Sequence, residues 1–278
     1  MTITDLAVQP KGRPAAAAIR YRSVLKAIDY LHEHLDEPLT LQALAEVAAL
    51  SPFHFSRVFR QITGLQPMRF LCALRLNEAK KLLLTTDLKV IDVCYAVGYN
   101  SLGSFGTRFA EMVGLTPSDL RCLAAKLQGI QLQERFAGCR SFQNVVPMSP
   151  GVRGRISGPE PFEGMTFVGL FRSPLPHRLP VACSVRQGFG AYHVPHVPDG
   201  RYYVVAAAVP WCNEPTAFFL HGNSLRGQSG PVWVQDNRTS GLVDLSLRRA
   251  LPTDPPIIPA LPLILAAQLE QADAGAQH

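Results

Sequence analysis

The sequence predicts a multidomain protein of the α plus β class, in which an all-α double helix-turn-helix domain precedes an antiparallel β-sandwich domain. Three observations predict it. A stretch of about twenty residues recurs fifty positions later. Apolar residues recur at helical spacing through residues 20–127. After Leu127 the chain changes to short β-prone runs separated by proline and glycine.

The internal repeat defines the helical domain. In each copy an apolar run, 41–47 or 90–97, precedes a small residue, a turn and a second helix that begins at a serine. A repeat of this length indicates a duplicated supersecondary unit, and this order of elements is that of a helix-turn-helix. The matched pairs are Val47 and Val97, Ser51 and Ser101, Phe55 and Phe105, Phe59 and Phe109, Gly64 and Gly114, Leu65 and Leu115, and Pro67 and Pro117.

Each second helix has a cap and two faces. The serine is expected at the N-cap, where its hydroxyl accepts from an amide without an intrahelical partner, and Pro52 occupies the favoured first position. Helical spacing predicts the buried stripes Phe55, Phe59 and Ile62, and Phe105, Phe109 and Met112. The opposite face of the first helix carries Phe53, Ser56, Arg57 and Arg60, and an arginine there could reach guanine edges.

One long helix is predicted between the two units, over residues 68–84. Phe70, Leu71, Leu74, Leu82 and Leu83 form its apolar side. Arg75, Lys80 and Lys81 are expected at its polar positions. At about 1.5 Å per residue it is long enough to hold the units apart. Recognition helices about 34 Å apart would enter successive major grooves of one duplex.

Four segments resemble the DNA-binding domain of the arabinose-regulator (AraC/XylS) family of bacterial transcription factors. They are SPFHFSRVF at 51–59, RLNEAKKLLL at 75–84, VGYNSLGSF at 97–105 and GLTPSDLR at 114–121. The resemblance spans roughly residues 21–121. It implies seven helices, readers that begin near Ser51 and Ser101, sequence-specific binding of double-stranded DNA, and no catalytic residue.

The resemblance also assigns DNA-contacting positions. Two glycines stand in the second reader where long polar side chains are common in the family, and an interior glycine costs a helix about 1 kcal/mol relative to alanine. We therefore expect the first reader to supply most base discrimination and the second mainly backbone affinity. The base-facing positions are Phe53, Ser56, Arg57, Leu102, Gly103, Gly106 and Thr107, and the backbone-facing ones are Ser51, Arg60, Ser101, Ser104 and Arg108.

Charge and cysteine content indicate which partners and sites the chain is expected to have. The chain carries a net charge of +6, but residues 20–127 hold 13 Lys+Arg against 10 Asp+Glu, so DNA affinity must come from the placement of charges. The six cysteines lack a Cys-x-x-Cys pair, which favours buried reduced thiols over a metal or disulfide site. We expect no metal, no cofactor, no signal peptide and no membrane contact, and a cytoplasmic, nucleoid-associated protein.

The sequence predicts five segments along the chain. Residues 1–19 are expected as a flexible arm, 20–127 as the helical domain, 128–148 as a linker, 149–252 as the β-sandwich and 253–278 as a Pro-rich apolar segment and tail. That segment is expected to cover a sheet edge, meet a partner or complete the sandwich core.

The second half of the chain reads as short strands, and their spacing favours an antiparallel sandwich or barrel. The predicted strands are 165–171, 181–185, 191–194, 201–209, 232–235 and 242–247.

The segment 190–206 is similar to the hairpin of transthyretin-like and carboxypeptidase-regulatory β-sandwich domains. In those domains a Pro-Asp-Gly turn, here Pro198–Gly200, joins two central strands. His193 and His196 lie three apart, so on a strand they face opposite sides and are not expected to share a metal.

Two functions remain compatible with the sequence. The first is a transcriptional regulator whose β domain senses an effector or dimerises, with RNA polymerase as a further candidate partner. The alternative is an enzyme or adaptor whose β domain carries the activity and whose DNA binding only localises it. The sequence contains no Gly-x-Ser-x-Gly, P-loop or His-Glu-x-x-His motif, which favours the regulator.

Overall fold

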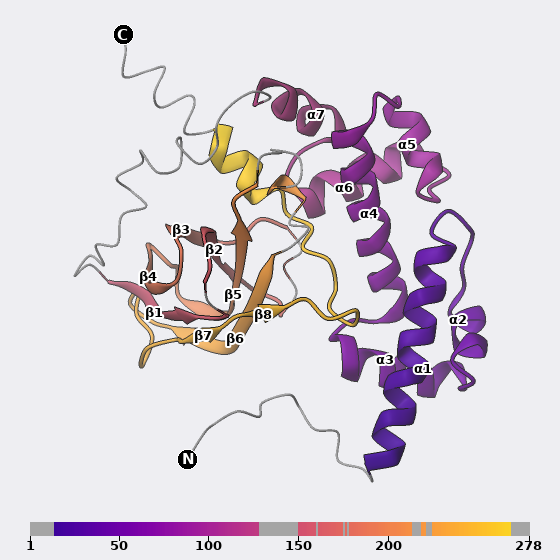
Figure 1. The fold of residues 1–278 in the computed structure, drawn as a ribbon, viewed down its shortest axis with the longest axis horizontal. Helices are drawn as coiled ribbons and strands as arrows, with labels where there is room; N and C mark the ends of the chain where they lie inside the picture. The colour runs from indigo at the N-terminus through magenta and orange to yellow at the C-terminus, as the bar shows by residue number, and fades with distance from the viewer. Residues whose placement is uncertain are drawn as a thin grey trace. The chain divides into compact units, whose positions relative to one another are not determined.

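The computed structural model has the helices α1 to α7 followed by a β-rich region (Figure 1). It describes residues 14–127, 150–159, 161–174, 176, 178–212, 218–220 and 224–267. The chain divides into two compact units, and the boundary falls within α4, between Leu74 and Arg75; residues 252–255 belong to the first unit. The predicted linker and the extreme C-terminus lie outside the described residues.

The first unit is helical. It holds α1 (Pro14–Glu33), α2 (Leu41–Val47), α3 (Pro52–Thr63) and the start of α4 (Pro67–Thr85). Residues 14–19, expected in the arm, are therefore the first turns of α1, and the rest of that arm lies outside the described residues. The core contains the predicted stripe, since Phe55 and Phe59 are fully buried and Phe59 meets Phe70 edge to face with ring centroids 5.4 Å apart. Ile62, the third member, is only half-buried.

The first unit also corrects one predicted cap. Ser51 occupies the N-cap of α3, but its hydroxyl makes no capping hydrogen bond to the helix. Pro52 at the first helical position already sets the backbone of that turn, and exposed amides there can bind water. In the second unit Ser101 does cap α6, because its hydroxyl accepts from Ser104 N at 3.4 Å.

The second compact unit contains the second copy of the helix-turn-helix. It continues α4 and holds α5 (Val90–Ala96), α6 (Leu102–Val113) and α7 (Pro117–Lys126). Phe105 and Phe109 are fully buried, and Met112 is half-buried. Gly114 ends α6 at a φ of 90°, as Gly64 ends α3 at 78°, so both repeated glycines form left-handed C-caps.

The β region is rich in antiparallel strands, as expected, and its strands differ in detail from those predicted. The structure has β1 (Gly151–Ser157), β2 (Gly164–Phe171), β3 (Ala182–Gln187), β4 (Gly190–Pro195), β5 (Gly200–Pro210), β6 (Leu225–Val234), β7 (Leu245–Ser246) and β8 (Arg248–Arg249). The predicted strand 232–235 is the end of a much longer β6, and 242–247 shrinks to the two residues of β7.

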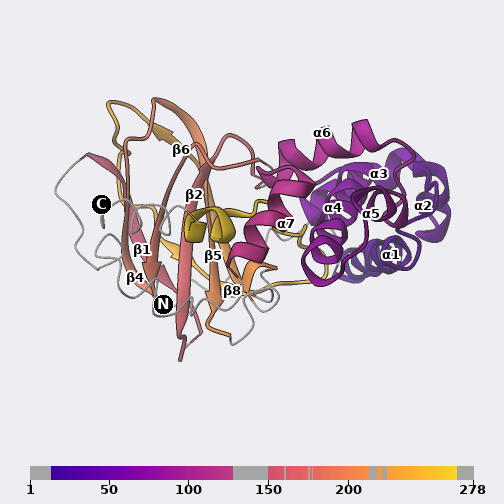
Figure 2. The ribbon, with the colours of Figure 1, turned by 90° about the horizontal axis from the view of Figure 1, so that it is seen from above.

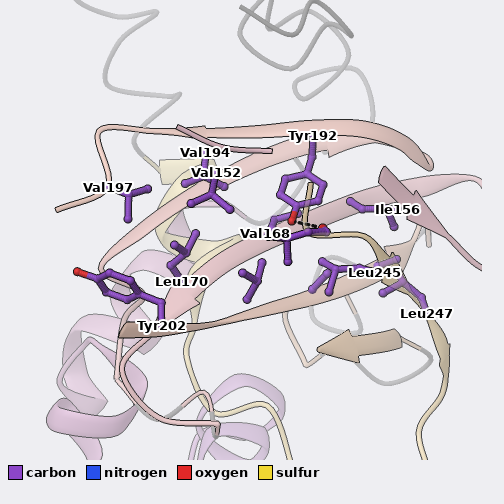
Figure 3. Close-up of a cluster of buried hydrophobic side chains, with 14 of the residues drawn as sticks. Val152, Ile156, Val168, Leu170, Tyr192, Val194, Val197, Tyr202, Leu245 and Leu247 are labelled. Atoms are coloured by element: carbon purple, nitrogen blue, oxygen red, sulfur yellow. Dashed lines mark hydrogen bonds between the residues drawn. The ribbon is translucent and has the colours of Figure 1, made fainter. Parts of the chain in front are cut away.

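The strands form two sheets, in the orders β4-β1-β7 and β3-β2-β5-β6-β8. Figure 2 labels β4 and β1 of the smaller sheet and β2 and β5 of the larger one. Neighbouring strands are antiparallel except for β1 with β7, which are parallel. A shared apolar core draws side chains from both sheets (Figure 3). Within it Tyr192 donates its hydroxyl to Val243 O at 2.6 Å. Its buried members include Val152, Val168, Leu170, Val194, Tyr202 and Leu245.

The predicted hairpin over 190–206 is wrong. β4 pairs with β1 in the smaller sheet, whereas β5 pairs with β2 and β6 in the larger one. The turn at Pro198–Gly200 therefore carries the chain from one sheet to the other. Alternation of apolar residues predicts a strand and its faces but does not identify the strand beside it.

The Pro-rich segment after residue 252 is part of the packed structure. Residues 261–267 are helical, and Ile258, Leu263 and Ala266 are buried. Ala260 N donates to Val113 O at 2.9 Å, which attaches this segment to the end of α6. The segment therefore packs against α4 and α6, and the buried core shared by the two sheets includes none of its described residues. Its three expected roles stay predictions.

Lys80 corrects the polar face predicted for α4. Its side chain is fully buried, and its ammonium donates to Ile257 O at 3.1 Å and to Ile258 O at 3.4 Å. Burial lowers the pKa of Lys80 from 10.5 to about 7. Lys81, by contrast, is exposed and pairs with Glu78 at 3.1 Å, as the pattern predicts.

Candidate nucleic-acid interface

The outer face of α3 presents the predicted first set of DNA-contacting residues. Phe53 is 83% exposed, Arg57 and Arg60 are exposed, and Ser56 is half-buried beside them. The helix takes this orientation because Phe55, Val58 and Phe59 occupy the buried stripe. The predicted Phe53, Ser56, Arg57 and Arg60 are therefore brought together on one surface.

These four side chains line an open groove of about 420 Å³. Gln61 and Gln66 complete its wall, and sequence reasoning missed both. Gln61 lies four residues after Arg57, so helical spacing alone would have placed it on the same face. No acidic side chain is among the described residues that line this groove, which suits it to a polyanion.

Arg57 already has a local partner that holds it over the helix. Its Nη2 lies 3.2 Å from His54 Nδ1, one turn earlier. A guanidinium so placed keeps further N–H donors for two acceptors side by side, which is the pattern of N7 and O6 on guanine. The exposed ring of Phe53 can contact the methyl group of thymine. This face therefore combines the two chemistries that distinguish base pairs in the major groove.

The corresponding face of α6 differs in chemistry. Leu102, Gly103 and Thr107 are exposed and Gly106 is half-buried. A Cβ added at Gly106 would meet no atom within 4 Å, and one at Gly103 would meet only Ser101 Oγ, at 3.9 Å. Packing within the chain therefore does not require either glycine, and the small size of these residues leaves helix backbone accessible from outside.

The remaining predicted positions on α6 are exposed but engaged within the helix. Ser101 Oγ caps the first turn, and Ser104 Oγ donates to Ser101 O at 3.0 Å. Arg108 forms a surface ion pair with Glu111, with Nη1 and Oε2 3.5 Å apart. An exposed pair of this kind contributes little to stability, so Arg108 can exchange Glu111 for a phosphate at small cost.

The described residues contain no candidate metal site. Among them no group of three or more His, Cys, Asp or Glu side chains could hold a metal ion. His193 is buried, with Nε2 3.3 Å from Pro150 O, while His196 is exposed. Two of the cysteines, Cys122 and Cys212, are exposed, contrary to the expectation of buried thiols. No helix in the described part of the chain is long and apolar enough to cross a membrane.

Comparison with known proteins shows which proteins the helical part of the chain is similar to. Residues 44–122 match the family model of a helix-turn-helix domain. The MmsAB operon regulatory protein of Pseudomonas aeruginosa is 38% identical over 92 residues, which are 33% of this chain and 30% of that protein. RhaS of an Enterobacter species, an HTH-type transcriptional activator, is 35% identical over 92 residues, which are 33% of each protein.

One solved structure is also similar to part of this chain. The transcriptional regulator from Chromobacterium violaceum, described as containing an AraC-type DNA-binding domain, is 26% identical, with a TM-score of 0.37, over 39% of this chain and 97% of that one. The chain spans less than half the length of the curated relatives that it matches, between 30% and 44% of the first three.

Proposed function

We propose that this chain, whose residues 44–122 belong to the AraC/XylS family of helix-turn-helix domains, is a transcriptional regulator that binds specific sequences of double-stranded DNA. The observation that carries the proposal is the surface of α3, where Phe53, Arg57 and Arg60 surround a groove without a lining carboxylate. We place its action on the bacterial chromosome, in the cytoplasm.

The two readers have different tasks in this proposal. α3 carries a guanidinium and an exposed aromatic ring and supplies most base discrimination. α6 offers Gly103, Gly106 and Thr107, whose small size lets its backbone approach phosphates. Ser51, Arg60, Ser101, Ser104 and Arg108 contact the DNA backbone.

The β region serves regulation in this proposal. We infer that its two sheets, which share a buried core, act as a sandwich that either senses a small-molecule effector or joins two copies of the chain. RNA polymerase is the further partner that an activator would contact. Concentration-dependent mass without ligand would favour dimerisation, and a thermal shift with one class of metabolite would favour sensing.

Selection from a randomised duplex pool tests the DNA-binding proposal. The full chain is expected to enrich one defined sequence motif. Arg57→Ala should lower affinity for it by about 10- to 100-fold and relax the preference at one or two base pairs, because the variant cannot form bidentate hydrogen bonds to guanine. Thr107→Ala, the matched control on α6, should keep the motif. Absence of any enriched motif with folded protein would refute the regulator, and a motif altered only by Thr107→Ala would refute the division of tasks.

The glycine at position 106 allows a separate test of the second reader. Gly106→Ala should stabilise the protein by about 1 kcal/mol, since the new methyl group meets no atom of the chain and alanine is the better helix former. DNA affinity should nevertheless fall several-fold, because the methyl group would keep the backbone away from phosphate. Thermal unfolding and a binding titration on the selected duplex measure the two effects. Unchanged affinity in the stabilised variant would contradict the close approach.

A further inference from the structure

A second hollow lies in the β region, within the second unit. Its volume is about 440 Å³, and its lining includes Gly151, Arg153, Arg238, Thr239 and Leu242. It opens between the start of β1 and the segment 238–242 that runs beside it. The residues that line it include two arginines, Arg153 and Arg238, and no aspartate or glutamate.

Arg153 approaches the cavity from a fixed strand. β1 pairs with β4 in the register Arg153 to His193, and on its other side Arg153 O accepts from Val243 N at 2.7 Å. Gly151, one step along the same strand face, cannot carry a Cβ without collision with the His193 ring and the Val194 carbonyl. Hydrogen bonds on both sides of β1 therefore hold the wall in place before any ligand arrives.

Arg238 approaches from a tight turn. Gln235 and Arg238 exchange backbone hydrogen bonds of 2.9 and 3.0 Å, and the two central residues, Asp236 and Asn237, take φ values of 51° and 56°. Positive φ at both central residues is the signature of a type I′ turn. Asn237 then ties this turn to the rest of the domain, since its Oδ1 accepts from Val197 N at 2.8 Å and its Nδ2 donates to Pro150 O at 3.3 Å.

The segment 239–242 forms the remaining wall of the cavity and supplies an apolar surface. Thr239 Oγ1 donates to Gly241 O at 2.6 Å, which fixes the bend before Leu242. Leu242 is 75% exposed, an unusual position for a leucine that lines a cavity. Three carboxylates lie close to the lining residues. Asp244 Oδ1 accepts from Arg155 N at 2.8 Å, Asp199 Oδ1 accepts from Asn237 N at 3.5 Å, and Asp236 lies in the turn two residues before Arg238.

We propose that this cavity, the Arg153–Arg238 pocket, binds a small organic anion. The two guanidinium groups would hold a carboxylate or a phosphate, the anions whose geometry arginine matches. Leu242 would contact the apolar part of the ligand, since pockets for small molecules combine apolar walls with a few charged groups. This site lies in the β region and does not depend on the DNA-binding proposal.

Calorimetric titration of the full chain tests the site, with inorganic phosphate, phenyl phosphate and citrate as probes at constant ionic strength. We expect one saturable site per chain for at least one probe. Arg238→Gln should weaken binding by about tenfold or more, because the variant cannot form the charge-assisted bidentate pair. Arg249→Gln, an exposed arginine of β8 outside the pocket, is the control and should bind as the wild type does.

Two further comparisons sharpen the test. Preference for phosphate or for citrate distinguishes a phosphorylated ligand from a carboxylate. Phenyl phosphate should bind about threefold or more tightly than phosphate, and Leu242→Ala should remove that advantage without loss of folding, because the side chain is mostly exposed. The proposal is overturned if no probe saturates, or if Arg249→Gln weakens binding as much as Arg238→Gln. Since Arg238 is exposed, a fold check by thermal unfolding separates a binding defect from instability.

Discussion

Lys80 and its neighbour Lys81 have the same side chain and opposite surroundings. Both lie in the second half of α4, where the spacing of apolar residues predicts solvent exposure. Lys81 is exposed, whereas Lys80 is buried with its ammonium against two backbone carbonyls. Those carbonyls belong to Ile257 and Ile258, in a segment far along the chain, so no local pattern could identify them.

The buried lysine predicts a pH dependence of stability. In the folded protein the pKa of Lys80 is about 7, and in the unfolded chain it returns to about 10.5. Between these values the unfolded chain binds more protons, so the free energy of unfolding rises with pH. Stability should therefore increase from pH 7 to pH 9.5, by at most about 1.4 kcal/mol per pH unit.

Chemical denaturation at several pH values measures this effect. Lys80→Met keeps most of the apolar stem and removes the titrating group, so the rise attributed to Lys80 should vanish. Lys81→Met is the control and should keep the wild-type pH dependence. A rise that survives in Lys80→Met would assign it to another group.

At the scale of elements, the two helix-turn-helix units are less alike than their sequences. α3 and α6 begin fifty positions apart, but α2 and α5 end forty-nine apart, so the second turn is one residue longer. The buried C-caps are Ala48 and Val97, not the aligned pair Val47 and Val97. The sequence alignment pairs Val47 with Val97 because the two residues are identical. It does not reveal the shift of one position, since an apolar residue stands near the turn in both alignments.

The turn of the first unit predicts a stabilising substitution. Ala49 follows the C-cap of α2 at a φ of 54°, where the second unit has Gly98 at 78°. A left-handed backbone costs a residue with a Cβ about 1 kcal/mol, and Ala49 is exposed, so its methyl group adds little packing. Ala49→Gly should raise the free energy of unfolding by about 0.5 kcal/mol, after the greater flexibility of glycine in the unfolded chain is subtracted.

Equilibrium denaturation against Ala18→Gly checks this prediction. Ala18 is an exposed residue inside α1, where the same substitution should lower stability by about 1 kcal/mol. Opposite signs in the two variants support the left-handed strain at Ala49. A loss of similar size in both would exclude it.

At the scale of the whole molecule, net charge is a weak guide to DNA binding. Residues 20–127 carry only three more basic than acidic side chains, yet Arg57 and Arg60 converge on a groove that no described carboxylate lines. The arginines of the β region, such as Arg153 and Arg238, add to the total charge but lie around another cavity. Placement rather than total charge therefore decides where a polyanion binds.

The salt dependence of DNA binding measures that placement. Removal of one phosphate-binding side chain should reduce the slope of log affinity against log salt concentration by about 0.9. Arg60→Gln and Arg108→Gln are each expected to do so while the preferred sequence stays the same. Arg249→Gln removes one positive charge from the β region and should leave the slope unchanged. Equal reductions in all three variants would mean that total charge, not the predicted phosphate contacts, sets the affinity.

The candidate interface could be predicted from the sequence to a large extent. Helical periodicity places Phe53, Arg57 and Arg60 opposite the stripe of Phe55 and Phe59, and the structure shows them exposed on one surface. Gln61 was missed although the same periodicity includes it. The contribution of Gln66 was not accessible to periodicity, because it lies beyond the end of α3 and enters the groove through the turn at Gly64.

Local patterns in the sequence by themselves determined the repeated helical units, the long helix between them, the exposed face of α3 and most strands of the β region. These features depend on side chains a few positions apart, which the helix and strand periods relate directly. Only the tertiary structure decided the partner of β5, the burial of Lys80 and the presence of Arg153 and Arg238 in the lining of one cavity. Each of these depends on segments far apart in the chain, whose contact arises from the packing of a common core and leaves no periodic signal in either segment.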